Sequence, residues 1–230
     1  MRLFRLLFLF ALPCGVFLSC SGKKKSPETP AETAKPDSSG TTLKKSGDLS
    51  AYRAWIDKEL AAWAASFEAF SPDSFTLTQE DSFSLAPTGE DPSSGENYAL
   101  FAPSLVYAPD SSAYLDLFSA GMMLEKKGKK IIATSDVDQA VNLYNRQTRE
   151  WNRIVSFGPS AGIEEAVWTS ADEFLLAGIF FNDNGQATPI LIAGNKKLQT
   201  LRWYGSSQVR PGDRKYESSG IVKLKIDEWE

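Results

Sequence analysis

Histidine is absent from the 230 residues of this chain, and its absence removes several chemistries at once. Histidine is the commonest general base of enzymes and the commonest metal ligand. A Ser-His-Asp triad, a Cys-His pair and a histidine-based zinc site are therefore excluded. Reactions that use carboxylates, tyrosine or lysine remain open, as does the binding of hard cations by oxygen ligands. The sequence also contains no phosphate loop, nucleotide fingerprint or cofactor-attachment motif, so we expect no cofactor.

The chain also lacks an apolar run that spans a membrane comfortably, which takes roughly 20 residues. Its N-terminal uncharged stretch, residues 6–18, follows the basic residues Arg2 and Arg5. A positive start followed by a short apolar segment is typical of a secretory signal peptide. The alternatives are an N-terminal membrane anchor and a buried apolar helix, and the charge and length of the segment disfavour both.

The apolar stretch ends in the sequence VFLSC at residues 16–20. This resembles the lipobox of bacterial lipoproteins, in which an apolar residue and a small residue precede an invariant cysteine. The resemblance implies cleavage between Ser19 and Cys20, a diacylglyceryl thioether on the Cys20 sulfur and an acyl group on its amine. Phe17 departs from the family pattern, in which leucine is commoner. A lipidated protein of this kind needs no membrane-spanning helix, because two or more acyl chains hold it stably to a bilayer.

Cysteine and basic residues are both scarce in the chain that would remain after cleavage. Of the two cysteines, Cys14 would leave with the signal and Cys20 would carry lipid. The mature domain would then have no thiol for a disulfide, a zinc site or a nucleophile. Removal of residues 1–19 takes away two arginines and no acidic residue, which changes the formal charge from −4 to −6. This acidic balance argues against a nucleic-acid partner, which needs a basic face.

Residues 20–47 comprise the lipidated cysteine and a predicted disordered tether. The segment 21–47 is mostly proline, serine, threonine, glycine and charged residues, and a flexible coil of this length spans roughly 30 Å. The three lysines at 23–25 face solvent or bind anionic lipid headgroups. No acidic residues directly follow the cysteine, which favours the outer membrane facing the periplasm over the cell surface. Ser21 is also not the aspartate that resembles an inner-membrane retention signal.

A single globular domain is expected over residues 48–230. In the segment 48–70, apolar residues recur every three or four positions, which predicts a helix that buries one face. We expect this amphipathic helix to pack on the core of the domain. The alternative is a partner helix or a membrane surface, which Asp57, Glu59 and Glu68 disfavour. The apolar positions are Leu49, Tyr52, Ile56, Leu60, Trp63, Phe67 and Phe70.

From residue 73 to residue 230 the pattern changes to short runs rich in β-branched and aromatic residues. Asn184-Gly185 is a strong hairpin signal, and residues 145–150 predict another turn. The last run, 220–226, alternates apolar residues with lysines and is expected to be an edge strand. The fold class is therefore mainly β, an antiparallel meander that forms a sandwich or curled sheet. The predicted strands are 103–108, 113–118, 130–135, 140–145, 150–156, 163–168, 173–181, 187–193, 197–204 and 220–226.

Two stretches within residues 103–204 share one layout. In each, an aromatic residue, Tyr107 or Trp168, precedes a polar turn, an apolar strand and a hairpin with a polar tip. This is similar to the repeats of bacterial β-propellers. The resemblance implies a partial, two-blade arrangement as the alternative to a sandwich, although closed propellers typically have four to eight blades. It transfers no catalytic residue, because propeller functions differ widely.

Few residues stand out as site candidates. Asp136 and Asp138 place two carboxylates at a strand end, and such a pair can hydrolyse glycosides when it is correctly spaced and buried. Glu164 and Glu165 precede an apolar strand, and we expect both to be solvated at its entrance. The aromatic residues expected to form a partner surface are Trp151, Trp203 and Tyr204.

These features together predict a non-enzymatic binding or assembly accessory of the cell envelope. We expect it to be attached to a membrane through lipid on Cys20 and to contact another envelope protein, with no bound metal. A lipid anchor and a tether raise the effective concentration of a domain near its partner. The alternative is a carboxylate-dependent hydrolase or cation-dependent glycan-binding protein that uses Asp136, Asp138 or Glu164. That alternative requires two or more acids to converge in a concave pocket.

Overall fold

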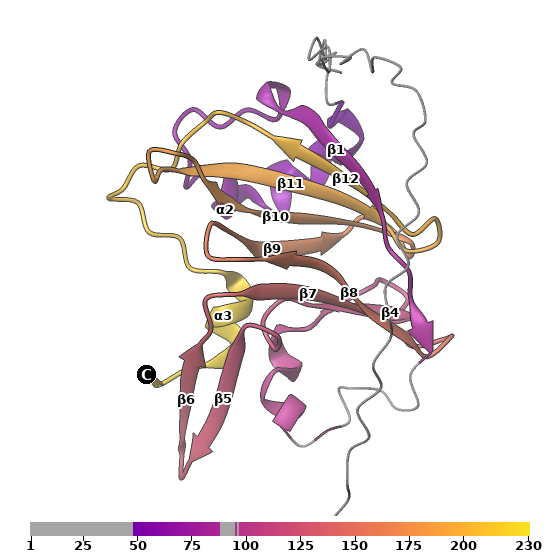
Figure 1. Cartoon of the computed structure of the whole chain (residues 1–230), viewed down its shortest axis with the longest axis vertical. Coiled ribbons are helices and arrows are strands. Elements are labelled where there is room, and N and C mark those ends of the chain that lie inside the picture. Colours follow the sequence, from indigo (N-terminus) through magenta and orange to yellow (C-terminus); the bar gives the residue numbers. More distant parts are fainter. Residues whose placement is uncertain (1–47, 88–94, 96) are drawn as a thin grey trace, which may run out of the picture. The chain divides into compact units, whose positions relative to one another are not determined.

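Two five-stranded antiparallel sheets and one three-stranded sheet make up most of the domain (Figure 1). The computed structural model describes residues 48–87, 95 and 97–230. These residues all belong to one compact unit. The predicted signal peptide over residues 1–19, Cys20 and the tether lie outside the described residues. Within them, the mainly-β fold class with antiparallel sheets is confirmed.

Sheet A is an antiparallel meander with one added strand. Strands β9 to β12 follow each other in the chain, and β1 from the N-terminal part pairs with β12. The β10–β11 hairpin turns at residues 182–186, where Gly185 has a φ of 70°. The hairpin predicted from Asn184-Gly185 is therefore confirmed. The order is β1 (Thr76–Ser82), β12 (Thr200–Gly205), β11 (Ala187–Asn195), β10 (Glu173–Phe181) and β9 (Ala161–Trp168).

Sheet B repeats this plan, and the two sheets share one turn chemistry. The turns β7–β8 and β11–β12 each begin with an asparagine, Asn145 or Asn195, whose side-chain oxygen accepts backbone N–H groups of its own turn. Each ends with a residue in the left-handed region, Arg149 or Gln199. The predicted turn at 145–150 is confirmed. The order is β2 (Ala86–Pro87), β8 (Glu150–Phe157), β7 (Gln139–Asn145), β4 (Ala113–Asp116) and β3 (Val106–Tyr107).

Sheet C is a hairpin that extends away from sheet B (Figure 1). Its strands β5 (Met122–Lys127) and β6 (Lys130–Ser135) are inserted between β4 and β7. The short strand β13 (Glu228–Trp229) pairs with β6 in parallel, so the order is β13-β6-β5. Two 3-10 turns, η4 (Asn97–Leu100) and η5 (Ala102–Ser104), precede β3, so the predicted strand 103–108 is shortened to the two residues of β3.

Side chains alternate along the strands of sheet A and create a core layer on each of its faces. One layer packs against sheet B, and the other packs against the N-terminal helical segment. The domain is thus built as helical segment, sheet A and sheet B in succession. The side chains toward sheet B include Phe174, Leu176, Ile192 and Leu201. Those toward the helical segment include Leu175, Ala177, Leu191 and Ala193.

The N-terminal helical segment is interrupted, so the prediction of one continuous helix over residues 48–70 is wrong. The amide of Leu60 bonds to the carbonyl of Trp55, five residues back, where a regular helix would use the fourth residue back. The buried face is nevertheless the predicted one, since Ile56, Leu60 and Trp63 are all almost fully buried. The elements are η1 (Ser50–Tyr52), α1 (Arg53–Lys58), α2 (Ala61–Ala64) and, after the segment, η2 (Pro72–Ser74).

The predicted edge strand 220–226 is also wrong, because this segment forms helix α3 (Ser219–Leu224). Ser218 caps the helix by accepting a hydrogen bond from the Gly220 amide. The buried residues Gly220 and Leu224 lie four positions apart, which is helical spacing, whereas Val222 is exposed. A Cβ at Gly220 would lie 2.4 Å from the Phe118 ring, so glycine permits the close packing of α3.

Candidate functional site

The acidic residues predicted for a hydrolase or a cation site are not brought together. Asp136 and Asp138 are exposed in the loop between β6 and β7, whereas Glu164 lies in β9 of sheet A. Within the described ranges 48–87, 95 and 97–230, no three His, Cys, Asp or Glu side chains gather in a way that could hold a metal ion. The described acids thus form no cation cage.

The three aromatic residues predicted as a partner surface are also separate. Trp151 lies in β8 of sheet B, and Trp203 and Tyr204 lie in β12 of sheet A. Tyr204 is 5% exposed and packs in the core against the helical segment, so it offers almost no surface to a partner. Trp203 is partly buried, and its ring lies 5.8 Å from that of Phe157 in an edge-to-face arrangement. Trp203 and Tyr204 therefore contribute to the packing of the domain.

Glu164 forms an ion pair and is largely shielded from solvent. The prediction that it is solvated at the entrance of its strand is therefore wrong. Both Nη atoms of Arg210 donate to its two carboxylate oxygens at 2.7 Å. Trp63 Nε1 also donates to the Glu164 carboxylate, at 2.9 Å. The ion pair is largely shielded from solvent, because the side chains of Arg210 and Glu164 are 9% and 18% exposed. Glu164 therefore joins the helical segment, sheet A and the C-terminal segment.

A β-bulge in β9 explains how Glu164 and Glu165 both find partners. Ile163 pairs with Gly178 and Glu165 with Ala177, which leaves Glu164 as the extra residue. A Cβ at Gly178 would lie 2.1 Å from the carbonyl oxygen of Gly162, so the strands approach closely at this point. The bulge lets the side chains of both residues reach hydrogen-bond donors: Glu164 binds Arg210, and Glu165 binds Tyr216 and Ser219.

Glu165 anchors the start of α3. Its carboxylate accepts hydrogen bonds from the Tyr216 hydroxyl at 2.7 Å, the Ser219 amide at 2.6 Å and the Ser219 hydroxyl at 2.7 Å. Burial raises the pKa of Tyr216 well above its usual value, and the hydrogen bond to Glu165 adds to this effect. Because its acceptor positions are occupied by the protein's own donors, Glu165 has a structural role.

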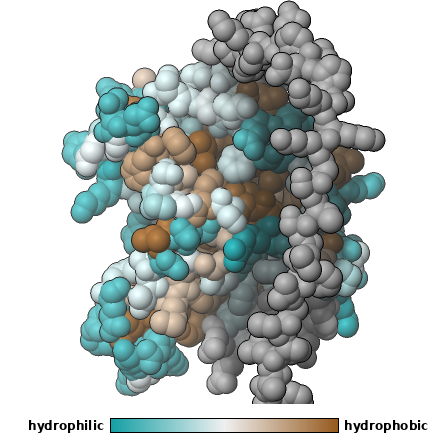
Figure 2. Space-filling view, in the orientation of Figure 1, coloured by the Kyte–Doolittle hydropathy of each residue, from teal (hydrophilic) through white to brown (hydrophobic). Residues whose placement is uncertain are grey.

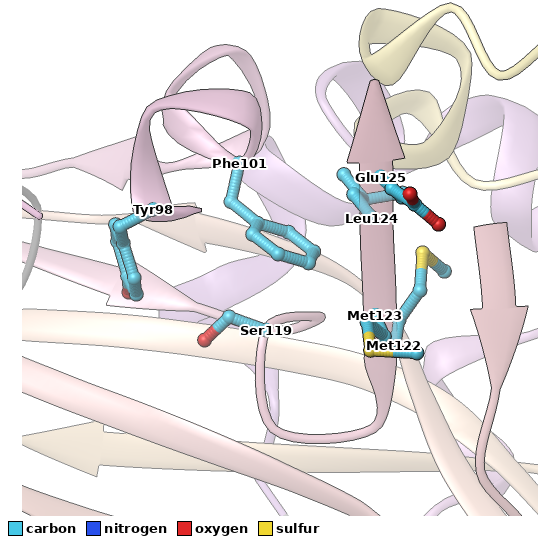
Figure 3. A pocket seen from close by; sticks show the side chains of 7 residues that line it. All are labelled: Tyr98, Phe101, Ser119, Met122, Met123, Leu124 and Glu125. Atoms are coloured by element: carbon cyan, nitrogen blue, oxygen red, sulfur yellow. The ribbon is translucent and has the colours of Figure 1, made fainter. Parts of the chain in front are cut away.

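A pocket of about 540 Å³ lies beside β5. One wall comes from Tyr98 of η4 and from Phe101, between η4 and η5, and the other comes from β5 (Figure 3). We call this cavity the methionine pocket, because Met122 and Met123 are adjacent in its wall, and Met123 is 65% exposed. A mostly apolar cavity with a few polar groups is the usual form of a ligand site. The pocket is lined by Tyr98, Phe101, Ser119, Met122, Met123, Leu124 and Glu125.

A buried carboxylate orients the two hydroxyl groups that line this pocket. Asp116 is fully buried, and its Oδ2 accepts hydrogen bonds from the hydroxyls of Tyr98 and Ser119. Its Oδ1 accepts from the amides of Phe118 at 3.1 Å and Ser119 at 3.0 Å. Burial raises the pKa of the Tyr98 hydroxyl strongly, and the nearby Asp116 carboxylate raises it further, so this hydroxyl stays protonated and donates.

The methionine pocket therefore has a defined hydrogen-bonding character. The protons of the Tyr98 and Ser119 hydroxyls are used on Asp116, so these hydroxyl oxygens can act toward a further group only as acceptors. Aromatic rings and methionine sulfur atoms also favour polarisable and cationic groups over anions. The arrangement is suited to binding a ligand between the apolar wall and the two residues that carry these hydroxyls.

None of the residues that line the pocket was predicted as a site residue from the sequence, although one feature of the sequence points to them. Two of the three methionines in the chain, Met122 and Met123, are neighbours, which is unusual in so methionine-poor a sequence. Asp116 and Tyr98 gave no such signal, because their contact joins residues 18 positions apart across a segment of irregular structure.

Comparison with protein-family models, with curated proteins and with solved structures returned no match. In the described part of the chain, the helices are all too short or too polar to cross a membrane.

Proposed function

We propose that this protein is a lipid-anchored lipoprotein of the bacterial cell envelope that serves as a non-enzymatic binding or assembly accessory. Its lipid is on Cys20, and it resides at the outer membrane facing the periplasm. A partner protein of the envelope binds at the methionine pocket. The observation that carries the binding role is this pocket, an apolar cavity whose polar groups are oriented by the buried Asp116.

The rest of the domain supports a binding role for this part of the surface. The β5–β6 hairpin extends away from sheet B (Figure 1), and the side chains of β5 are exposed or partly exposed except for that of Leu124. Hydrophilic side chains gather at the tip of the hairpin, where the sequence reads EKKGKK (Figure 2). An apolar patch rimmed by polar residues is typical of a protein interaction site.

The tether gives this binding role its reach. The tether predicted from the sequence of residues 21–47 would span roughly 30 Å as a flexible coil, and the domain would then search a shell next to the membrane. Tethering raises the effective concentration of two partners on one membrane without any added contact. A modest pocket is then sufficient for a specific encounter.

Site-specific crosslinking in the native envelope tests the binding role. A photoreactive phenylalanine analogue replaces Met123 in one variant and Leu198 in the other. The two positions are matched, because their side chains are 65% and 68% exposed. We expect the probe at position 123 to capture one envelope protein repeatedly, and the probe at position 198, in the β11–β12 turn, to capture none.

Two results would contradict the proposal. One is equal capture from both positions, which would indicate random collisions. The other is an absence of capture at position 123 together with hydrolysis of a glycan or ester by the purified chain, which would favour the carboxylate-dependent alternative.

A further inference from the structure

The β5–β6 hairpin presents backbone groups on its outer sides. β5 pairs with β6 over residues Met122–Lys127 and, among the described residues, with no second strand. The side of β5 that faces away from β6 is named here the β5 edge. Unpaired edges can template another strand, and lysines commonly guard them. Lys126 and Lys127 lie near the tip, whereas the stretch 122–124, which borders the methionine pocket, has no charged side chain.

The opposite side of the same hairpin already binds an extended segment. There, β13 pairs in parallel with β6, and the amides of Asp227 and Glu230 donate to the carbonyls of Ile131 at 2.8 Å and Ala133 at 2.9 Å. An ion pair between Lys130 and Glu228 accompanies the backbone bonds. The hairpin thus pairs with a strand of its own chain through backbone hydrogen bonds, and an exposed ion pair lies beside them.

The β13 segment on the other side of the hairpin carries the acidic residue Glu228, whereas the methionine pocket beside the β5 edge would favour a positively charged side chain. Its two hydroxyls act as acceptors, and the buried Asp116 carboxylate lies behind them. Glu125 supplies an acidic group to the lining, and its carboxylate also forms an exposed ion pair with Lys127 at 3.5 Å. Tyr98 and Phe101 supply aromatic rings, which attract ammonium and guanidinium groups. Figure 3 shows these rings across the cavity from β5. A cation on an apolar stem matches this lining.

We infer that the partner presents an extended peptide segment that adds as a strand to the β5 edge and places one lysine or arginine side chain in the methionine pocket. This inference rests on the proposed function and specifies the chemistry of the partner. Backbone hydrogen bonds give the affinity, and the pocket gives the specificity, as in other cases of strand addition. The basic side chain lies at the Met122 end, because Lys126 and Lys127 repel it at the tip.

Peptide binding to the full chain in detergent tests this inference. The probe is a labelled nine-residue peptide of alternating threonine and valine with a central lysine. One control peptide has norleucine at the centre, which keeps the stem and removes the charge, and a second has alternate amides methylated. We expect the lysine peptide to bind about ten-fold tighter than the norleucine peptide, because hydrogen bonds to charged groups are the stronger ones. The methylated peptide should not bind, and amide exchange at residues 122–124 should slow at about ten-fold lower concentrations of the lysine peptide than of the norleucine peptide.

A matched pair of protein variants locates the site. Met123→Lys places a positive charge beside the pocket, and Leu198→Lys places one at an equally exposed position elsewhere. We expect the first variant to weaken binding of the lysine peptide about ten-fold or more through like-charge repulsion, and the second to leave it unchanged.

The outcomes separate this inference from the proposed function. Absence of binding by every peptide at millimolar concentration, or equal binding by the lysine and norleucine peptides, overturns the inference. So does a free alkylammonium ion that binds as tightly as the lysine peptide, because the ligand class would then be a small cation. In each of these cases, capture by the probe at position 123 would leave the proposed function intact.

Discussion

Arg210 and Glu164 are 46 residues apart in the chain, yet their side chains meet in a two-point ion pair with both N···O distances at 2.7 Å. The Arg210 guanidinium lies 4.6 Å from the centre of the Phe67 ring and 5.4 Å from that of Tyr216. Its Nε also donates to the Ser66 hydroxyl at 3.0 Å. One arginine therefore joins the C-terminal segment to β9 and to the N-terminal helical segment.

Loss of this arginine should destabilise the domain. Arg210→Ala leaves the shielded Glu164 carboxylate without its cation, and removal of one partner of a buried pair typically costs about 3 kcal/mol or more of the free energy of unfolding. The matched control is Glu80→Gln, which breaks the exposed ion pair with Arg202 and should cost less than about 1 kcal/mol. Urea denaturation measures both, and equal costs would show that the Arg210 pair has no special structural role.

The bulge in β9 should depend on Gly178. In Gly178→Ala, the new methyl group would meet the Gly162 carbonyl at 2.1 Å, so the strands must separate or the bulge must move. We expect a loss of about 1–3 kcal/mol of stability, the range for overpacked sites. Gly212→Ala is the control, because nothing lies within 4 Å of a Cβ at that position. A thermal midpoint for Gly178→Ala that equals that of the control would contradict the close strand approach.

Stability should fall in alkaline solution because of two partly buried tyrosines. The pKa values of Tyr98 and Tyr216 are raised, chiefly by burial, so folding favours their neutral forms. Their contribution to stability is fully present below about pH 10, the pKa of an unfolded tyrosine, and is lost as the pH rises above it toward the folded pKa values. Denaturation at pH 8 to 11 measures the slope. Tyr98→Phe and Tyr216→Phe should each flatten it, and unchanged slopes would contradict the prediction.

Local patterns predicted most strands of sheets A and B, although the predicted strands include neither β1 nor β2. Alternation and turn residues are properties of neighbouring residues, so strand β10 was predicted over its full extent, 173–181, and the Asn184-Gly185 hairpin was found where expected. The prediction for residues 220–226 is wrong because their alternation of apolar residues and lysines fits an edge strand, although the segment forms helix α3. The close packing of Gly220 on Phe118, which requires the folded domain, instead favours a helix. The resemblance of residues 103–204 to propeller blades stays a prediction.

The candidate site was beyond what local patterns reveal. Asp116 accepts a hydrogen bond from Tyr98, which is 18 residues away in the chain. Glu164 is bound by Arg210 and Trp63, which are 46 and 101 positions away. Such contacts depend on how the sheets and the terminal segments pack. The acidic residues Asp116 and Glu165 are therefore buried and have structural roles that their sequence context does not indicate. Tyr204, which was expected at the surface, lies in the core.

The intact mass of the protein extracted from its native envelope tests the central claim, lipid anchoring at Cys20, most directly. We predict a membrane-bound chain that begins at Cys20 and is heavier than residues 20–230 by a diacylglyceryl group and an acyl group. Cys20→Ser should lose the lipid and either keep its signal peptide or remain unanchored. A water-soluble form that begins at another residue, or an uncleaved precursor as the stable product, would contradict the account.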